Sequence, residues 1–189
     1  MKVNIIGIIG AILAFITLAL PWWTCTISAG AMGMTLSFDV TVSLYEAKAT
    51  AMGVSQTAPL DVWYGKVALA LIIVAGILAI VGSVTRFGKK LLASGGVLAL
   101  ISIIVFAVGL NDDLSRTSPV PNAPSGFPQI GLFSSGSFDY MGFSYSYSSY
   151  LTYGFWLALI AAILMFVAIV KAPAPTQTSE VSVFSQPQS

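Results

Sequence analysis

The chain has 189 residues, of which 57% are hydrophobic and 8% are charged, and its formal net charge is +1. Soluble domains carry about 25% charged residues, so this composition excludes a water-exposed globular surface and favours an integral membrane protein. The near-neutral charge excludes the basic footprint of nucleic-acid binding. The chain has no histidine and one cysteine, Cys25, so we predict no intramolecular disulfide, no metal and no cofactor.

The first apolar run, Val3–Trp23, contains no charged residue and is long enough to cross a bilayer core, which takes about 20 apolar residues. Lys2 ahead of it is also compatible with a secretory signal peptide, but signal-peptide apolar regions run about 7–15 residues, so we favour a span. The run ends in Pro21-Trp22-Trp23, which is typical of a membrane interface. Bulky residues before Cys25 disfavour a lipoprotein anchor there.

Residues 24–66 form the first predicted outer loop, and they carry a strand pattern. From Met34 to Leu44 apolar residues at even positions alternate with polar residues at odd positions, which indicates a half-buried strand. Trp23, Cys25 and Ile27 alternate with Thr and Ser in the same way, and a glycine-bearing turn over residues 29–33 separates the two stretches. We predict a β-hairpin that rises directly from the first helix.

Two further apolar runs, residues 67–84 and 91–110, are free of charge and can each span a bilayer. The short connection between them, residues 85–90, carries Arg86, Lys89 and Lys90. The positive-inside rule places this inner loop in the cytoplasm. With four crossings, both termini lie there too, and residues 24–66 and 111–150 lie outside.

The second outer loop, residues 111–150, begins with a proline-rich stretch and then carries aromatic residues at alternate positions, Phe143, Tyr145 and Tyr147. The pattern predicts a second hairpin that turns near residues 135–136 or near residues 141–142. A lone hairpin is only marginally stable in water. We therefore expect the two outer loops to pair into one sheet.

A fourth apolar run, residues 151–170, completes the predicted bundle, and we expect the polar tail, residues 172–189, to be disordered in the cytoplasm. The fold class predicted is an all-α four-helix transmembrane bundle with a small extracellular antiparallel β-sheet cap. Small residues spaced four apart predict close packing within the bundle, in preference to an oligomer seam. The positions are Gly7, Gly10, Ala75, Gly95, Gly154 and Ala158.

One local motif links this order of parts to a known class. Trp23 follows the first run, and Ser43-Leu44-Tyr45 follows further along the first outer loop. The pattern resembles the claudin and peripheral-myelin-protein class of four-span proteins, which carry a Trp and then Gly-Leu-Trp at matching places. The matching residues are Trp23, Leu44 and Tyr45, while both loop cysteines of that class are absent. The resemblance implies cytoplasmic termini and an outer sheet built from both loops, and it does not transfer tight-junction function.

Few residues could carry chemistry. No ionisable residue lies inside the four runs, which disfavours a pump or a proton-coupled transporter. Asp112 and Asp113 stand at a helix exit beside Arg116, and a solvated cluster explains them better than an acid–base pair. We therefore predict a non-enzymatic scaffold, accessory or contact protein of the plasma membrane that binds itself or another membrane protein. The alternative is an oligomeric pore for small neutral solutes or lipids.

The tyrosines of the second outer loop have two interpretations. Tyr and Ser are typical of binding surfaces, which makes Tyr140, Tyr145, Tyr147 and Tyr150 candidates for a contact surface. Aromatic residues at every second position are also a strand signal, and we favour the interpretation that they form the buried face of the sheet.

Overall fold

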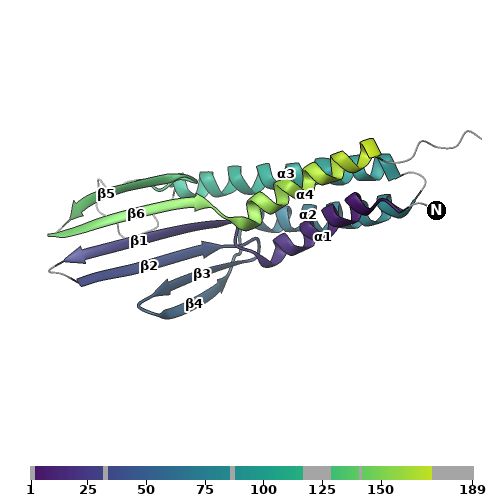
Figure 1. The fold of residues 1–189 in the computed structure, drawn as a ribbon. Helices are drawn as coiled ribbons and strands as arrows, with labels where there is room; N and C mark the ends of the chain where they lie inside the picture. Colours follow the sequence, from purple (N-terminus) through teal and green to yellow (C-terminus); the bar gives the residue numbers. More distant parts are fainter. Residues whose placement is uncertain (1–2, 32–33, 86–87, 117–128, 141, 172–189) are drawn as a thin grey trace, which may run out of the picture.

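The computed structural model describes residues 3–31, 34–85, 88–116, 129–140 and 142–171. In these ranges the chain forms a bundle of four helices, and an antiparallel sheet extends from one end of it, with strands that run away from the helices roughly along the bundle axis (Figure 1). The helices are α1 (Ile5–Ile16), α2 (Trp63–Val84), α3 (Gly88–Arg116) and α4 (Tyr153–Lys171). The strands are β1 (Trp23–Ala31), β2 (Met34–Val42), β3 (Glu46–Ala51), β4 (Val54–Pro59), β5 (Ser134–Tyr140) and β6 (Phe143–Leu151). The predicted tail and the proline-rich stretch lie outside the described residues.

Three of the helices are long and apolar enough to cross a membrane, by length and composition. They are Trp63–Val84, Gly88–Arg116 and Tyr153–Val170, while Ile5–Ala19 is a shorter apolar helix. These three helices fit the prediction that the chain is a membrane protein. The predicted fold class is confirmed in part, as four helices joined to one antiparallel sheet, and the sheet, with six strands, is larger than a small cap.

The first helix is shorter than the apolar run that encodes it. It starts at an N-cap, Asn4, whose side chain accepts a hydrogen bond from the Gly7 amide and donates one to the Ala168 carbonyl at 2.8 Å. A 3-10 turn, Thr17–Ala19, follows α1, and the helical conformation then ends. The prediction that the helix reaches Trp23 was wrong because the Trp22 amide donates to Val42 and Trp23 already pairs in the sheet.

The third helix is longer than predicted. It continues to Arg116 past the last apolar turn, and its end carries an i,i+4 ion pair in which Arg116 Nε lies 2.9 Å from Asp112 Oδ1. Hydropathy marks only the part of a helix that suits lipid. The polar turns of α3 lie at the end of the bundle from which the sheet extends (Figure 1).

The two outer loops form one six-stranded sheet with the order β4-β3-β2-β1-β6-β5. Pairing of β1 with β6 joins the loops, which confirms the predicted single sheet. Tyr140 pairs with Phe143, so the second hairpin turns between these two residues, at the second of the two predicted places, and Gly142 has a φ of +78°. The hairpin of β3 and β4 was not predicted, because small alanines there replace a strong apolar alternation.

Alternation gives the sheet two chemically different faces. Cys25 pairs with Val40 and Ser149, and Ile27 pairs with Phe38 and Tyr147, so these side chains share one apolar face. The opposite face is rich in Ser and Thr. It also carries all of the charged strand residues, which are Asp39, Glu46, Lys48 and Asp139.

Small residues hold the helices close together. A Cβ at Gly95 would lie 3.0 Å from the Ala75 carbonyl oxygen, and one at Gly10 would lie 3.2 Å from that of Ala161. A Cβ at Gly7 would overlap Ser83 on α2, and Ala158 is fully buried. Gly10, Gly95 and Ala75 thus lie where the backbones of two helices approach closely, while Gly7 leaves room for a side chain of α2. Large side chains, among them Ile72, Leu92, Phe106 and Met165, fill the remaining space in the bundle.

Candidate contact surface

The junction between bundle and sheet is built around Trp22. Its side chain is fully buried, and its indole Nε1 donates to the Thr17 carbonyl at 3.0 Å. Its ring makes an edge contact with Phe106 of α3 at a centroid distance of 5.0 Å. On the backbone, the Trp22 amide donates to Val42 and the Trp22 carbonyl accepts from Thr152, which ties the starts of β1 and α4 together.

This position differs from the interfacial role that the sequence suggests for Trp22. A tryptophan at the end of an apolar run usually faces the headgroups. Here the chain turns directly into the sheet, so the ring packs against protein, and Gly154 leaves room for it because a Cβ there would lie 2.5 Å from Trp22 Cδ1. Trp63 and Tyr153, which are 66% and 77% exposed, do lie on the outside at this level.

The three residues of the claudin-like motif lie near this junction. Trp23 and Leu44 are buried, while Tyr45 is half-exposed. Trp23 Nε1 donates to the Leu132 carbonyl at 3.3 Å, so a residue of the first loop fixes a segment of the second. The Tyr45 carbonyl accepts from the Leu60 amide, which closes the chain around β3 and β4.

The half of the apolar face nearest the bundle is covered over β1, β6 and the end of β2. Ile130 is 1% exposed, and the Ser149 hydroxyl donates to the Gly131 carbonyl at 2.8 Å. Residues 129–133 therefore lie over Trp23, Cys25 and the end of β6. Val42 and Leu151 are also buried on this proximal half.

The far half of the same face is open to solvent. We call Ile27, Ala29, Leu36, Phe38, Tyr145 and Tyr147 the distal apolar face. Leu36 and Phe38 are 49% and 38% exposed, and the other four are half-buried. Phe143 at its rim is also exposed. Exposed apolar patches of this kind often mark interaction sites, so the distal apolar face is the candidate contact surface.

Aromatic rings stiffen the distal apolar face. The rings of Phe138 and Tyr145 stack at a centroid distance of 5.0 Å with 7° between their planes. Tyr147 lies beside Phe138 at 6.4 Å, over Gly136 of the neighbouring strand. Rigid aromatic side chains of this kind lose little conformational entropy on binding.

The predicted contact tyrosines do not lie together. Tyr145 and Tyr147 share the distal apolar face, whereas Tyr150 pairs with Thr24 and faces the other way, 50% exposed. Tyr140 pairs with Phe143 at the far end of the sheet, and its side chain is not among those that the structure describes. Leu36 and Phe38, which lie exposed on the distal apolar face, were not among the predicted contact residues, because an alternating strand was interpreted as buried along its whole length.

Electrostatics at the covered half favour a neutral thiol. Burial, with a smaller contribution from the negative charge of Asp39, raises the pKa of Cys25 from 9.0 to about 11. Asp39 itself accepts a hydrogen bond from the Thr26 hydroxyl at 2.7 Å on the polar face. Cys25 is therefore an apolar packing residue at neutral pH, as the sequence suggests.

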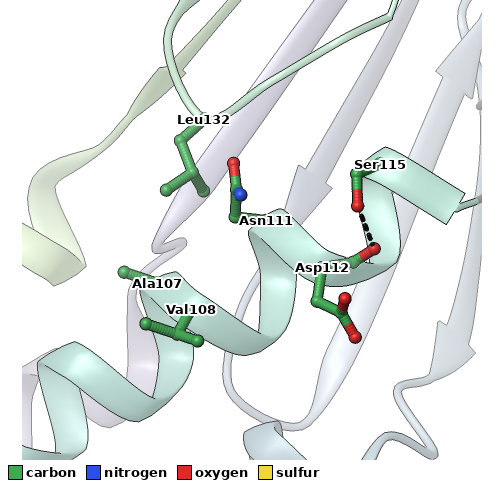
Figure 2. A pocket seen from close by; sticks show the side chains of 6 residues that line it. All are labelled: Ala107, Val108, Asn111, Asp112, Ser115 and Leu132. Atoms are coloured by element: carbon green, nitrogen blue, oxygen red, sulfur yellow. Dashed lines mark hydrogen bonds between the residues drawn. The ribbon is translucent and has the colours of Figure 1, made fainter.

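A shallow pocket of about 440 Å³ opens where α3 meets residues 129–133. Ala107 and Val108 line one end, and Asn111, Asp112 and Ser115 line the other, under Leu132 (Figure 2). The Asp112 carboxylate points away from Leu132, as Figure 2 shows, and accepts a hydrogen bond from Arg116. The Ser115 hydroxyl donates to the Asp112 carbonyl. Within the described residues no cluster of three or more Cys, Asp or Glu could hold a metal. The pocket marks where the second loop leaves the helix.

Comparison with known proteins adds no relative. No model of a known protein family matches the chain, and no curated protein sequence matches it.

Proposed function

We propose that this chain is a non-enzymatic plasma-membrane protein that crosses the bilayer four times and binds protein through its outer sheet. The observation that carries the proposal is the distal apolar face, which projects from the bundle end and stays exposed. A resemblance to the claudin class supports it through the order of parts: a helix, four strands, two helices, two strands and a helix.

The fourth crossing is proposed for α1 and the turn after it. The helix packs between α2 and α4, and the side chains that it turns outward are Ile5, Ile9, Ile12 and Ile16. Isoleucine suits a lipid-facing surface, because the medium around the helix is then the hydrocarbon of the bilayer rather than water. Asn4 anchors the start of α1 to Ala168 and Ser83, which lie at the far ends of the two neighbouring helices.

Cytoplasmic termini are proposed from charge. Lys89 and Lys90 stand at the start of α3, at the end of the bundle away from the sheet, where α1 begins and α4 ends (Figure 1). The positive-inside rule then directs the sheet to the exterior. Asp61 and Lys66 form an exposed ion pair at the sheet end, and the lysine lowers the pKa of the Asp61 carboxyl.

Cysteine labelling tests the topology. In a Cys25→Ala background we place single cysteines by Ser55→Cys, Ser137→Cys and Lys90→Cys, all at exposed positions. A membrane-impermeant maleimide added to intact cells labels the first two, and Lys90→Cys reacts only after permeabilisation. Labelling of Lys90→Cys in intact cells contradicts the proposed orientation.

Copurification tests the contact function. The full-length protein is recovered from native membranes with a tag on either end, and bound proteins, including untagged copies of the chain, are identified by mass spectrometry. We expect Leu36→Ser to reduce recovery of the partner, because interface hot spots are buried apolar anchors. Thr35→Ala, an exposed change on the opposite face, is the matched control. Equal recovery with both variants contradicts a role for this face.

A further inference from the structure

The outer turns of α3 lie at the level of the lipid headgroups when α2 and α3 cross the bilayer as proposed above. Tyr64 packs against Gly109, because a Cβ added at Gly109 would lie 2.3 Å from Tyr64 Cγ. Trp63, the neighbour of Tyr64, is 66% exposed, and an exposed tryptophan at the end of a spanning helix is typical of the headgroup region. The part of α3 around Gly109 is therefore where hydrocarbon gives way to headgroups.

One outward stripe of α3 changes from apolar to polar at this level. Ile104 and Val108 are 60% and 64% exposed and present hydrocarbon outward. The next positions on the stripe, which follow Val108 at helical spacing, are Asn111, Asp112 and Ser115, and all three are polar and exposed. The stripe thus has the polarity of a lipid molecule, apolar toward the bilayer centre and polar toward the outside.

The pocket of about 440 Å³ lies on this stripe, and Leu132 forms its roof (Figure 2). The Leu132 carbonyl accepts a hydrogen bond from Trp23 Nε1 at 3.3 Å. The adjacent Gly131 amide donates to Ser134 Oγ at 3.2 Å, and the Gly131 carbonyl accepts from the Ser149 hydroxyl at 2.8 Å. These bonds tie the roof to three strands of the sheet, so the pocket is already formed without a ligand. A shallow pocket suffices for a lipid, because only the headgroup enters it and the acyl chains stay in the bilayer.

The charges beside the pocket decide which headgroups it accepts. The Asp112 carboxylate accepts a hydrogen bond from Arg116 at 2.9 Å, and Arg116 stands one helical turn further from the bilayer. A phospholipid presents its phosphate nearest the hydrocarbon, and a zwitterionic one presents its ammonium group further out. The phosphate would then meet the carboxylate and the ammonium would meet the guanidinium, and like charges repel in both places. An uncharged headgroup meets neither repulsion.

We propose that the pocket binds the uncharged, hydroxyl-bearing headgroup of a glycolipid from the surrounding leaflet. The Asn111 side chain points toward Leu132 in Figure 2, and no hydrogen bond among the described residues uses its amide group. An amide offers two donor hydrogens and an acceptor oxygen, which suits the adjacent hydroxyl groups of a sugar. The Asp112 carboxylate accepts a further hydroxyl, and the acyl chains run along Val108 and Ile104. The proposal rests on α3 crossing the bilayer, which is part of the proposed function, and it does not depend on what the distal apolar face binds.

Competition between lipids tests the proposal. The purified full-length chain in detergent is equilibrated with an equimolar mixture of a hexosyl diacylglycerol, a phosphatidylcholine and a phosphatidylglycerol that share the same acyl chains, and native mass spectrometry measures the lipid retained. We expect one hexosyl lipid to be retained at least about fivefold over either phospholipid. Asn111→Leu removes the amide with little change in size, and it should reduce this preference to within about twofold. Asn111 is exposed, so the variant should fold like the wild type.

Two carboxylates provide a matched pair of variants. Asp112→Asn and Asp61→Asn each remove the acid of an exposed ion pair, and Asp61 with its partner Lys66 lies outside the pocket lining. Asp112→Asn should raise the retention of phosphatidylglycerol at least about threefold, because its phosphate no longer meets a carboxylate. Asp61→Asn should leave the ratios of the three lipids unchanged. If phosphatidylglycerol is rejected equally by both variants, the pocket does not select by charge and the proposal is overturned.

Photo-cross-linking locates the bound lipid. A hexosyl diacylglycerol with a diazirine on its sugar should cross-link to residues 107–115 or 129–133 in the wild type. Cross-links confined to other residues, equal retention of the three lipids, or a preference for phosphatidylcholine would each overturn the proposal. Failure of copurification through the distal apolar face would leave this inference intact. Labelling of Lys90→Cys in intact cells would reverse the proposed orientation and place the same pocket among the headgroups of the other leaflet.

Discussion

The proximal and distal halves of the outer sheet carry the same alternation of apolar and polar residues, but their apolar side chains differ in solvent exposure. Val42 near the bundle is 6% exposed, whereas Leu36 on the same strand and the same face is 49% exposed. Residues 129–133 and the helix ends cover the first half. Among the side chains that the structure describes, those of the second half stay open or half-buried.

The difference shows that alternation of apolar and polar residues identifies which side chains share one face of a strand. It does not show whether another part of the protein packs against that face. Removing a Val or Leu side chain from water contributes about 1.5–3 kcal/mol. The proximal half receives that stabilisation when the chain folds. The distal half receives only part of it, and the rest becomes available when something binds. A strand can therefore serve the core at one end and recognition at the other.

The largest effect is expected where the proximal half joins the bundle. Trp22→Ala removes a fully buried ring from between α3 and the strand ends, and it removes one of the two donors to the Thr17 carbonyl, which keeps the Leu20 amide. We expect a loss of about 3–5 kcal/mol in the free energy of unfolding, which is the cost of replacing a buried Trp by Ala. Denaturant unfolding in detergent micelles measures the loss.

Trp63→Ala is the matched control for that measurement. Trp63 stands at the same level but is 66% exposed. Its replacement should cost about 1 kcal/mol or less. Similar losses for the two variants would show that the junction does not depend on Trp22 and would remove the basis for treating the proximal half as core.

A pair of charge insertions separates the two halves directly. Val42→Asp buries an unpaired carboxylate in the proximal half and should cost about 3–5 kcal/mol. Phe38→Asp places the same group on the open half, where water still reaches it, and should cost about 1 kcal/mol in the unfolding of the single copy. The unfolding midpoints of dilute protein provide the comparison. An equal loss for Phe38→Asp would mean that the distal face is core.

Thiol reactivity gives a smaller and more local comparison. The raised pKa keeps Cys25 protonated until about pH 11, and its side chain is 2% exposed. We expect maleimide to modify Cys25 at neutral pH roughly 100-fold more slowly than Leu36→Cys in a Cys25→Ala background, because the thiolate is the nucleophile. The rate at Cys25 should rise as pH approaches 11. Rapid modification at pH 7 would show that the cover over the proximal half opens readily.

Much of the fold follows from periodicity and charge alone. Apolar runs locate α2, α3 and α4 to within a few turns, and the alternation of residues 34–44 locates β2. The pairing of both loops follows because a lone hairpin is marginal in water. These features depend on local patterns, which the sequence displays directly.

Other features depend on contacts between distant residues. The Asn4 side chain donates a hydrogen bond to Ala168, 164 positions away, and the Thr152 hydroxyl donates one to Pro21, 131 positions away. The sequence around each residue contains no pattern that predicts its partner. The β3–β4 hairpin escaped notice because alanine is a weak strand signal. The distal apolar face was only partly predicted: the tyrosine pattern identified β6, while the exposure of Leu36 and Phe38 depends on where residues 129–133 end.

The smallest effect is expected at Tyr150, and it decides which face makes the contact. Tyr150 is exposed on the polar side of β6, close to the bundle and to Tyr153, a place typical of a headgroup anchor. Tyr150→Ala should leave recovery of the copurified partner within about twofold of the wild type and shift the unfolding free energy by about 0.5 kcal/mol or less. Tyr147→Ala, three residues earlier on the distal apolar face, should weaken the contact by at least about 1 kcal/mol, as a hot spot does. Both variants remove a tyrosine ring from β6, one from each face of the sheet. Loss of the partner in Tyr150→Ala with retention in Tyr147→Ala would assign the contact to the Ser- and Thr-rich face instead.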